Sequence, residues 1–184
     1  MLKKIDSAIL AGCTRFSHWL QRMTGLTNYF VANVGTGCAA IGMMLRIANY
    51  FHRMFDEPTT LFDTVIYGAM MFVAISTSLN CTRAQDDFLS GKITKPAELQ
   101  MYYSLGNFVR LPFAALFLLQ SFTLCLRLPQ NPYWLLNIAG RTFPTLGFTT
   151  FFYFIVVDPL PPGRSKVRQL LERLLGVREA VSTI

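Results

Sequence analysis

The segment LTNYFVANVGTGCAAIGMMLRIA, residues 26–48, decides the fold class of this chain. It holds no charged residue before Arg46, and it exceeds the about 20 apolar residues that a helix needs to cross a bilayer. Water cannot satisfy peptide groups in the hydrocarbon core, so a segment placed there must close its backbone hydrogen bonds within a helix. The sequence therefore predicts a membrane-spanning helix at residues 26–48.

Small side chains recur through this segment at helical spacing. Ala32, Thr36 and Ala40 are four residues apart, and Gly35 and Ala39 lie beside them in the sequence. Small residues on one face let two helix backbones approach closely in lipid. We expect Ala32, Gly35, Thr36, Ala39 and Ala40 to form a helix-packing surface inside the membrane.

Composition and three further apolar segments extend this prediction to the whole chain. Of its 184 residues 52% are hydrophobic and 15% are charged, whereas soluble domains carry about 25% charged residues. The further spans are expected at residues 61–81, 104–128 and 133–157, with a polar loop at 82–103. The last span contains Arg141 and Pro144, so we expect a kink near Pro144. The fold class is thus an all-α integral membrane protein whose residues 25–157 form a bundle of four transmembrane helices.

The two ends of the chain have the pattern of helices that lie in the membrane interface. In residues 1–24, apolar residues recur every three or four positions and Lys and Arg occupy the other face. Residues 158–184 begin with a Pro-rich break and continue as a basic amphipathic tail, with a helix expected at about 165–177. Packing on a partner protein is the alternative for each amphipathic helix.

Positive charge is distributed unevenly across the predicted spans. If both termini and the central polar segment share one side, that side carries most of the 17 Lys and Arg residues. The positive-inside rule then places both termini in the cytosol for a bacterial inner membrane, or in the matrix for a mitochondrial inner membrane. We interpret the net charge of +7 as topology control and attraction to anionic phospholipids, and we expect no nucleic-acid binding.

Residues that carry catalysis or bind metals are sparse. His18 and His52 are the two histidines, and neither lies in the middle of a predicted span, as an axial haem ligand between helices would. The four cysteines are widely spaced and form no CxxC pair of the kind that binds zinc. Apart from Asp63, near a span end, the spans hold no carboxylate of the kind that transporters place at midplane. We therefore expect no enzymatic activity, no cofactor and no metal site.

Two arginines lie inside predicted spans, where a charge is costly and often functional. Arg110 falls in the first turns of the span at 104–128, and Arg141 falls within the span at 133–157. A long side chain can extend to the interface, or the guanidinium can pair with a lipid phosphate or a carboxylate of a neighbouring subunit. Arg141 and Arg110 are our candidate lipid-binding or partner-binding residues.

The segment HWLQRMTG, residues 18–25, resembles the segment that leads into the first helix of complex II membrane-anchor subunits, whose pattern is near H-W-x-x-Q-R-x-T-[AG]. In that family the Arg and a neighbouring hydroxyl lie near the quinone site, so the resemblance implies Arg22 and Thr24 as quinone-site residues. The spacing here differs by one residue, and the family's haem-ligand histidine in the second span has no counterpart in this sequence. Those anchors typically have three spans rather than four.

Three functions remain open at the level of sequence. The leading hypothesis is a non-catalytic membrane subunit that packs into and stabilises a larger membrane protein complex. The first alternative is a pore-forming or membrane-perturbing homo-oligomer, of toxin or phage-defence type, with a path lined by Asn33, Thr36 or Arg141. The second alternative is the membrane anchor of a complex II-like quinone enzyme that uses Arg22. The expected partners are other membrane subunits or copies of the chain itself, together with anionic phospholipids.

Overall fold

The structure is a computed structural model that describes residues 2–51, 58–91, 97–125, 134–161, 165–167 and 170. Over these residues the chain is all-helical, as predicted. Its helices are α1 (Leu2–Thr24), α2 (Asn28–Phe51), α3 (Pro58–Leu89), α4 (Ala97–Cys125) and α5 (Trp134–Ile155). Within the described residues, three segments are long and apolar enough to cross a membrane: Asn28–Tyr50, Leu61–Leu89 and Leu99–Thr123. These segments indicate a membrane-embedded protein, as the sequence predicted.

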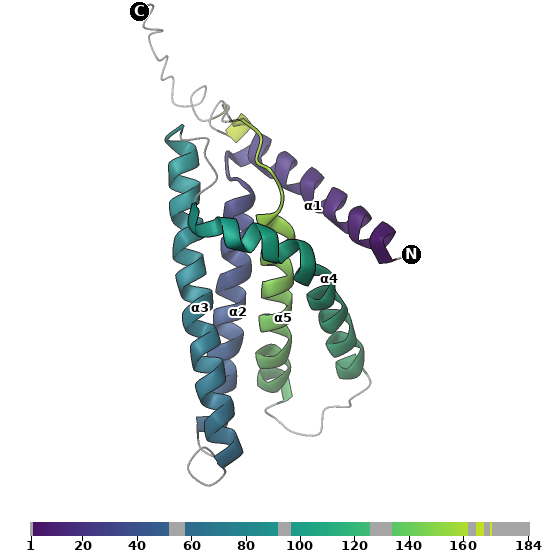
Figure 1. The fold of residues 1–184 in the computed structure, drawn as a ribbon, viewed down its shortest axis with the longest axis vertical. Coiled ribbons are helices and arrows are strands. Elements are labelled where there is room, and N and C mark those ends of the chain that lie inside the picture. Colours follow the sequence, from purple (N-terminus) through teal and green to yellow (C-terminus); the bar gives the residue numbers. More distant parts are fainter. Residues whose placement is uncertain are drawn as a thin grey trace, which may run out of the picture.

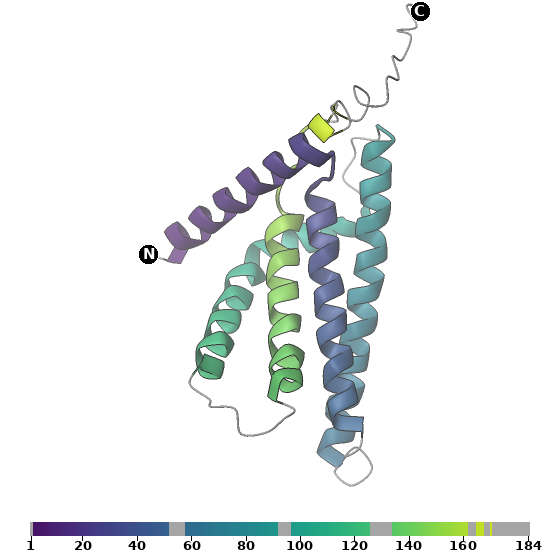
Figure 2. The ribbon, with the colours of Figure 1, turned by 180° about the vertical axis from the view of Figure 1, so that it is seen from behind.

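Helices α2, α3 and α5 run side by side along the long axis of the molecule (Figure 1). Contacts join α3 to α2, α2 to α5, and α5 to α4, so these four helices form a layer in that order. Helix α1 lies across one end of this layer, as the view from behind also shows (Figure 2). The layer therefore has α2 and α5 at its centre and α3 and α4 at its edges.

Helix α4 changes direction within its length. Its first part crosses the layer near the α1 end, and its second part runs beside α5 (Figures 1 and 2). Pro112 lies inside this helix. A proline removes one backbone hydrogen bond and its ring clashes with the carbonyl four residues earlier, which bends a helix. The predicted span at 104–128 therefore contains a bend. Helix α5 is likewise continuous through Pro144, and the kink predicted there stays a prediction.

The loop predicted for residues 82–103 is wrong over most of its length. Helix α3 continues to Leu89, and α4 already begins at Ala97. In the added turns of α3, Ala84 and Phe88 are buried against the neighbouring helices. Packing of one face stabilises a helix even where its outer face is polar, and a search for continuous apolar segments misses such turns.

The predicted tail helix at about 165–177 lies outside the described residues except for 165–167 and 170. The segment 158–161, which precedes it, returns along the end of the bundle beside α1 (Figure 1).

The closest approach between helices joins α2 to α5. A Cβ atom added at Gly35 would lie 2.7 Å from the carbonyl oxygen of Gly147, and one added at Gly147 would lie 2.6 Å from the backbone nitrogen of Ala39. Two turns along α2, a Cβ atom at Gly42 would lie 2.7 Å from the Cβ of Phe143. At these distances there is no room for a side chain, so glycine is required for the two backbones to touch.

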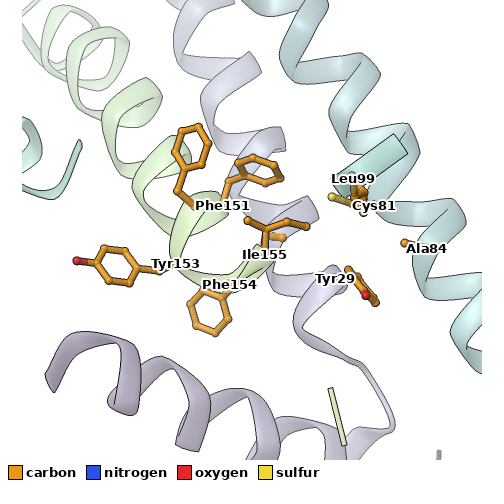
Figure 3. Close-up of a cluster of buried hydrophobic side chains, with 10 residues drawn as sticks. Tyr29, Cys81, Ala84, Leu99, Phe151, Tyr153, Phe154 and Ile155 are labelled. Carbon is orange, nitrogen blue, oxygen red and sulfur yellow. The ribbon is translucent and has the colours of Figure 1, made fainter. Parts of the chain in front are cut away.

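Buried aromatic and apolar side chains gather where α5 ends (Figure 3). The cluster draws on four helices and consists of Tyr29, Ala32, Cys81, Ala84, Leu99, Phe151, Phe152, Tyr153, Phe154 and Ile155. Phe154 also meets Phe16 of α1 edge to face, with ring centroids 5.9 Å apart. Helix α5 is thus enclosed by neighbouring helices at this end, although its apolarity does not place it among the three candidate spans.

Replacing Gly35 by alanine should loosen the α2–α5 pair. The added methyl group would meet the Gly147 carbonyl at 2.7 Å and the Phe151 nitrogen at 2.9 Å. We expect a loss of about 1–3 kcal/mol in the free energy of unfolding, measured by titration with SDS in mixed micelles. Gly37→Ala is the matched control on the same helix, because nothing lies within 4 Å of its Cβ position. An equal loss in both variants would contradict the proposed backbone contact.

Candidate functional site

A polar contact of three residues ties α1 to α4 and α5. The Arg110 guanidinium donates to both carboxylate oxygens of Asp6 at distances of 2.7 to 3.1 Å. The Tyr153 hydroxyl donates to the same carboxylate at 3.0 Å. The side chains of Arg110 and Asp6 are only 12% and 18% exposed. The hydrogen bonds from Arg110 outweigh desolvation and hold the pKa of Asp6 below its usual value.

Arg110 is therefore engaged within the chain. Besides Asp6, it donates to the side-chain oxygen of Asn107 at 2.9 Å, and its guanidinium lies 6.0 Å from the ring centroid of Tyr153. These contacts occupy several of the five N–H donors of an arginine. They favour a structural role in holding α1, and lipid or partner binding by Arg110 stays a prediction.

The segment that resembles the complex II anchors contacts the chain that follows α5. The Nε2 atom of His18 lies 3.1 Å from the carbonyl oxygen of Asp158. The amide of Gln21 donates to the carbonyl of Leu160 at 2.6 Å and accepts from the Leu160 nitrogen at 2.9 Å. One buried side chain thereby satisfies both peptide groups of a residue outside any helix. These contacts fasten the segment after α5 to α1.

Arg22 and Thr24, which the resemblance assigns to a quinone site, lie at the end of α1. Arg22 is exposed. The Thr24 hydroxyl donates to the Leu20 carbonyl at 2.8 Å and accepts from the Leu26 nitrogen at 3.1 Å. Gly25 follows with a φ of 86°, a conformation that favours glycine and closes the end of the helix. Thr24 shapes the turn between α1 and α2, and quinone binding stays a prediction.

Polar side chains of α2 and α3 are buried at this same end. The backbone nitrogen and the hydroxyl of Thr27 both donate to the Oε1 of Gln85, at 3.1 and 2.5 Å. The amide of Asn28 donates at 3.1 Å to the carbonyl of Phe154, in the last turn of α5. That carbonyl also accepts from the Val157 nitrogen at 3.2 Å, so Asn28 adds a second hydrogen bond at the end of α5. Side-chain hydrogen bonds, as well as apolar packing, thus hold the helix ends together.

The predicted packing residues lie in the interfaces of α2. Ala32, Thr36 and Ala39 are fully buried, Gly35 contacts Gly147, and Ala40 is half-buried.

Asn33 joins α2 to α3. Its amide nitrogen donates to the Thr82 hydroxyl at 3.0 Å, and its carbonyl oxygen accepts from the Ser78 hydroxyl. The Thr36 hydroxyl donates at 2.8 Å to the backbone carbonyl of Asn33. Asn33 and Thr36, the residues considered for a pore lining, are therefore used in contacts within the chain.

At the end of α2 farthest from α1, Arg46 packs against two tyrosines. Its guanidinium carbon lies 4.4 Å from the ring centroid of Tyr67 and 6.0 Å from that of Tyr50. The two rings are stacked, with centroids 6.5 Å apart. These distances are within the range of cation–π contacts. Arg46 thus has one face against aromatic rings.

Arg141 approaches the same place from α5. The preceding residue, Gly140, packs on the backbone of Arg46, since a Cβ atom added there would lie 3.4 Å from the Arg46 nitrogen. Arg141 therefore follows directly on a residue that contacts the Arg46 backbone, and lipid or partner binding by Arg141 stays a prediction. We call Arg46, Tyr50 and Tyr67 the arginine–tyrosine cluster. A guanidinium recognises anionic oxygens through paired N–H donors.

The described part of the chain contains no group of three or more His, Cys, Asp or Glu that could hold a metal ion. Comparisons with protein-family models, curated proteins and solved structures find no match.

Sequence reasoning missed the contacts of Asp6 and Gln21. Asp6 and Arg110 are 104 positions apart, and Gln21 and Leu160 are 139 apart. Spacing rules act within one helix or motif, so they give no signal for such pairs. A carboxylate in the otherwise basic first helix was the one available hint.

Replacing Asp6 by asparagine should release α1 from the bundle. The change removes the ionic partner of Arg110, and hydrogen bonds to charged groups contribute about 1.5–3 kcal/mol. We expect faster maleimide labelling of the half-buried Cys13 in α1 and unchanged helix content by circular dichroism. Ser7→Ala is the control, because the Ser7 hydroxyl bonds only locally, to the Lys4 carbonyl. Labelling rates that match the native chain would show that the Asp6–Arg110 contact does not hold α1.

Acid should have the same effect as Asp6→Asn. The pKa of Asp6 is lowered in the folded chain, so its contribution to docking is complete above the unfolded value of about 3.9 and is lost as the pH falls through the folded value. We expect amide exchange in α1, corrected for intrinsic rates, to stay constant between about pH 5 and 8 and to rise below about pH 4. In Asp6→Asn the exchange should already be fast at neutral pH and should lack this acid-induced rise.

Proposed function

We propose that this chain is a non-catalytic, multi-pass membrane subunit that packs into a larger membrane protein complex. The observation that carries the proposal is the exposure of α3. Only 11% of its most apolar stretch is buried within the protein. The side chains of Phe62 and Phe72 are 66% and 73% exposed. Large apolar surfaces of this kind need lipid or another protein to cover them.

In this proposal α5 is the fourth span. Its 22 residues correspond to about 33 Å of helix, close to the roughly 30 Å of the hydrocarbon core. Contacts with α2 and α4, rather than lipid, cover much of the surface of α5. A helix enclosed by protein can hold threonines, glycines and an arginine at lower cost than one that faces lipid.

Helix α1 and the first part of α4 would lie in the interface at one end of the bundle. Helix α1 lies across one end of the layer, and the first part of α4 crosses the layer near the same end (Figures 1 and 2). Phe16 and Trp19 of α1 are 47% and 56% exposed, as suits a helix whose apolar side dips into the headgroup region. Arg15, Arg22 and Arg83 are exposed at this end. Their charge supports placing it on the cytosolic or matrix side of an inner membrane.

The outer face of α3 favours a protein neighbour over lipid alone. Phe72, Ser76 and Asn80 follow one another at intervals of four, so they share one face of the helix. Ser76 is exposed and Asn80 is half-buried. Hydroxyl and amide groups in lipid gain from hydrogen bonds to another helix. A neighbouring subunit that packs on this face would provide both apolar cover and those bonds.

A photo-crosslinking residue placed at Phe72 tests this proposal. With p-benzoylphenylalanine at Phe72, we expect a crosslink in high yield to one different polypeptide that co-purifies in equal amount in mild detergent. The control places the same photo-crosslinking residue at Met71, which packs inward against the buried side chains of Ala39, Met43 and Ala74. This variant should give no such product. Crosslinks from Phe72 to lipid alone, or to a second copy of the chain, would reject the hetero-complex. The second result together with ion flux in liposomes would support the homo-oligomeric pore.

A further inference from the structure

We infer that α1 and the segment that follows α5 form one surface that binds anionic lipid headgroups, and that Gln21 joins its two parts. We call residues 158–161 and 165–167 the return segment. The inference rests on the proposed membrane insertion and deepens it, because it names the chemistry of the headgroup and the residue that holds the surface together.

Helix α1 has three different faces. Its buried face packs on the bundle and includes Ser17 and Gln21. A second face is apolar and exposed, and helical spacing brings together on it Ile5, Ile9, Phe16 and Trp19. The third face is a basic row of three exposed residues, which are Lys4, Arg15 and Arg22. They are 11 and 7 positions apart, about three and two turns, so they share one side of the helix.

The basic row and the apolar face adjoin each other. Lys4 directly precedes Ile5, and Arg15 directly precedes Phe16, so the two faces lie about 100° apart around the helix. An exposed apolar face beside a row of cations is the pattern of a helix that lies in a membrane surface.

The return segment runs along the last turns of α1 (Figures 1 and 2). Gln21 bonds both peptide groups of Leu160, at 2.6 and 2.9 Å. Just past the end of α1, a Cβ atom added at Gly25 would lie 3.6 Å from the Cβ of Ser165. Ser165 is buried by this packing. The residues that follow Ser165 therefore begin at the end of α1.

The exposed charge of the two parts is positive in sum. Lys166 and Val167 complete the return segment, and both are exposed. Neither Lys166 nor any member of the basic row forms an ion pair with another described residue. The acidic residue of α1, Asp6, is already engaged by Arg110. The return segment adds one carboxylate, that of Asp158, so most of the four exposed cations have no acidic counterpart here.

A lipid surface fits these features better than an acidic protein. The apolar face extends from Ile5, which is 44% exposed, to Trp19, which is 56% exposed, and acyl chains would cover it. Tryptophan is typical of the headgroup level of a bilayer. Each Lys or Arg near an anionic surface strengthens binding about fivefold. Helix α1 is also fastened across the end of membrane-embedded helices, where the bilayer surface is the nearest surface.

Lipid photo-crosslinking by the reconstituted full chain tests the inference. p-Benzoylphenylalanine is placed at Trp19 or at Val167, in liposomes of phosphatidylcholine and phosphatidylglycerol, and the crosslinked lipids are identified by mass spectrometry. We expect lipid crosslinks from both positions, with phosphatidylglycerol enriched over its share in the liposomes. Gln21→Ala should lower the yield from Val167 about fivefold and leave the yield from Trp19 unchanged, because only the return segment loses hydrogen bonds. Gln100→Ala removes an exposed amide from α4 and should change neither yield.

A second pair of variants tests the charge. Replacing Arg15 and Arg22 together by glutamine should abolish the enrichment of phosphatidylglycerol, because two cations of the surface are lost. Replacing both by lysine keeps the charges and should keep the enrichment.

Four results would overturn the inference. Enrichment that survives in the double glutamine variant, or is lost in the double lysine variant, would exclude recognition by charge. An unchanged yield from Val167 in Gln21→Ala would show that Gln21 does not join the two parts. Crosslinks in native membranes to an acidic polypeptide in place of lipid would assign the surface to a protein. Carbonate extraction separates these from failure of the proposed function: a chain released by carbonate does not span the membrane, whereas a retained chain without lipid crosslinks lacks only this surface.

Discussion

The backbone contact between α2 and α5 is the constraint on which the rest of the structure depends. At Gly35 and Gly147 the two backbones meet directly, and Gly42 lies against the side chains of Phe143 and Pro144. Further contacts join α2 to α5 at both ends of this backbone contact. Asn28 reaches the last turn of α5 at one end, and Gly140 packs on Arg46 at the other. In lipid there is little hydrophobic gain from joining two helices, so close packing and hydrogen bonds must supply the association.

The two ends of the bundle differ in their chemistry. At the α1 end, charged and polar groups are paired within the chain, by Asp6 with Arg110 and by Gln21 with Leu160. These contacts hold α1 and the segment after α5 across the helix ends. At the other end the Arg46 guanidinium packs on the stacked rings of Tyr50 and Tyr67. The first end is thus held by paired polar groups, and the second includes cation–π contacts.

The edges of the layer complete the proposed function. Helix α3 has protein on one side only, and its outer face combines exposed aromatic side chains with Ser76 and Asn80. A chain that serves as scaffold would need such a face, together with a stable centre that does not depend on the partner.

The sequence by itself determined the helical class, the apolar segments and the small-residue face of α2, because hydropathy and helical period are local properties of the chain. It also determined the uneven distribution of positive charge and the position of the proline inside α4. The tertiary structure alone decided which helices are neighbours, how far α3 extends, and that Asp6 pairs with Arg110 across 104 positions. It also decided that α5, which carries Arg141 and Pro144, lies beside α2 at the centre of the layer. The physical reason is that the arrangement of helices depends on contacts between residues distant in sequence, which no local pattern encodes.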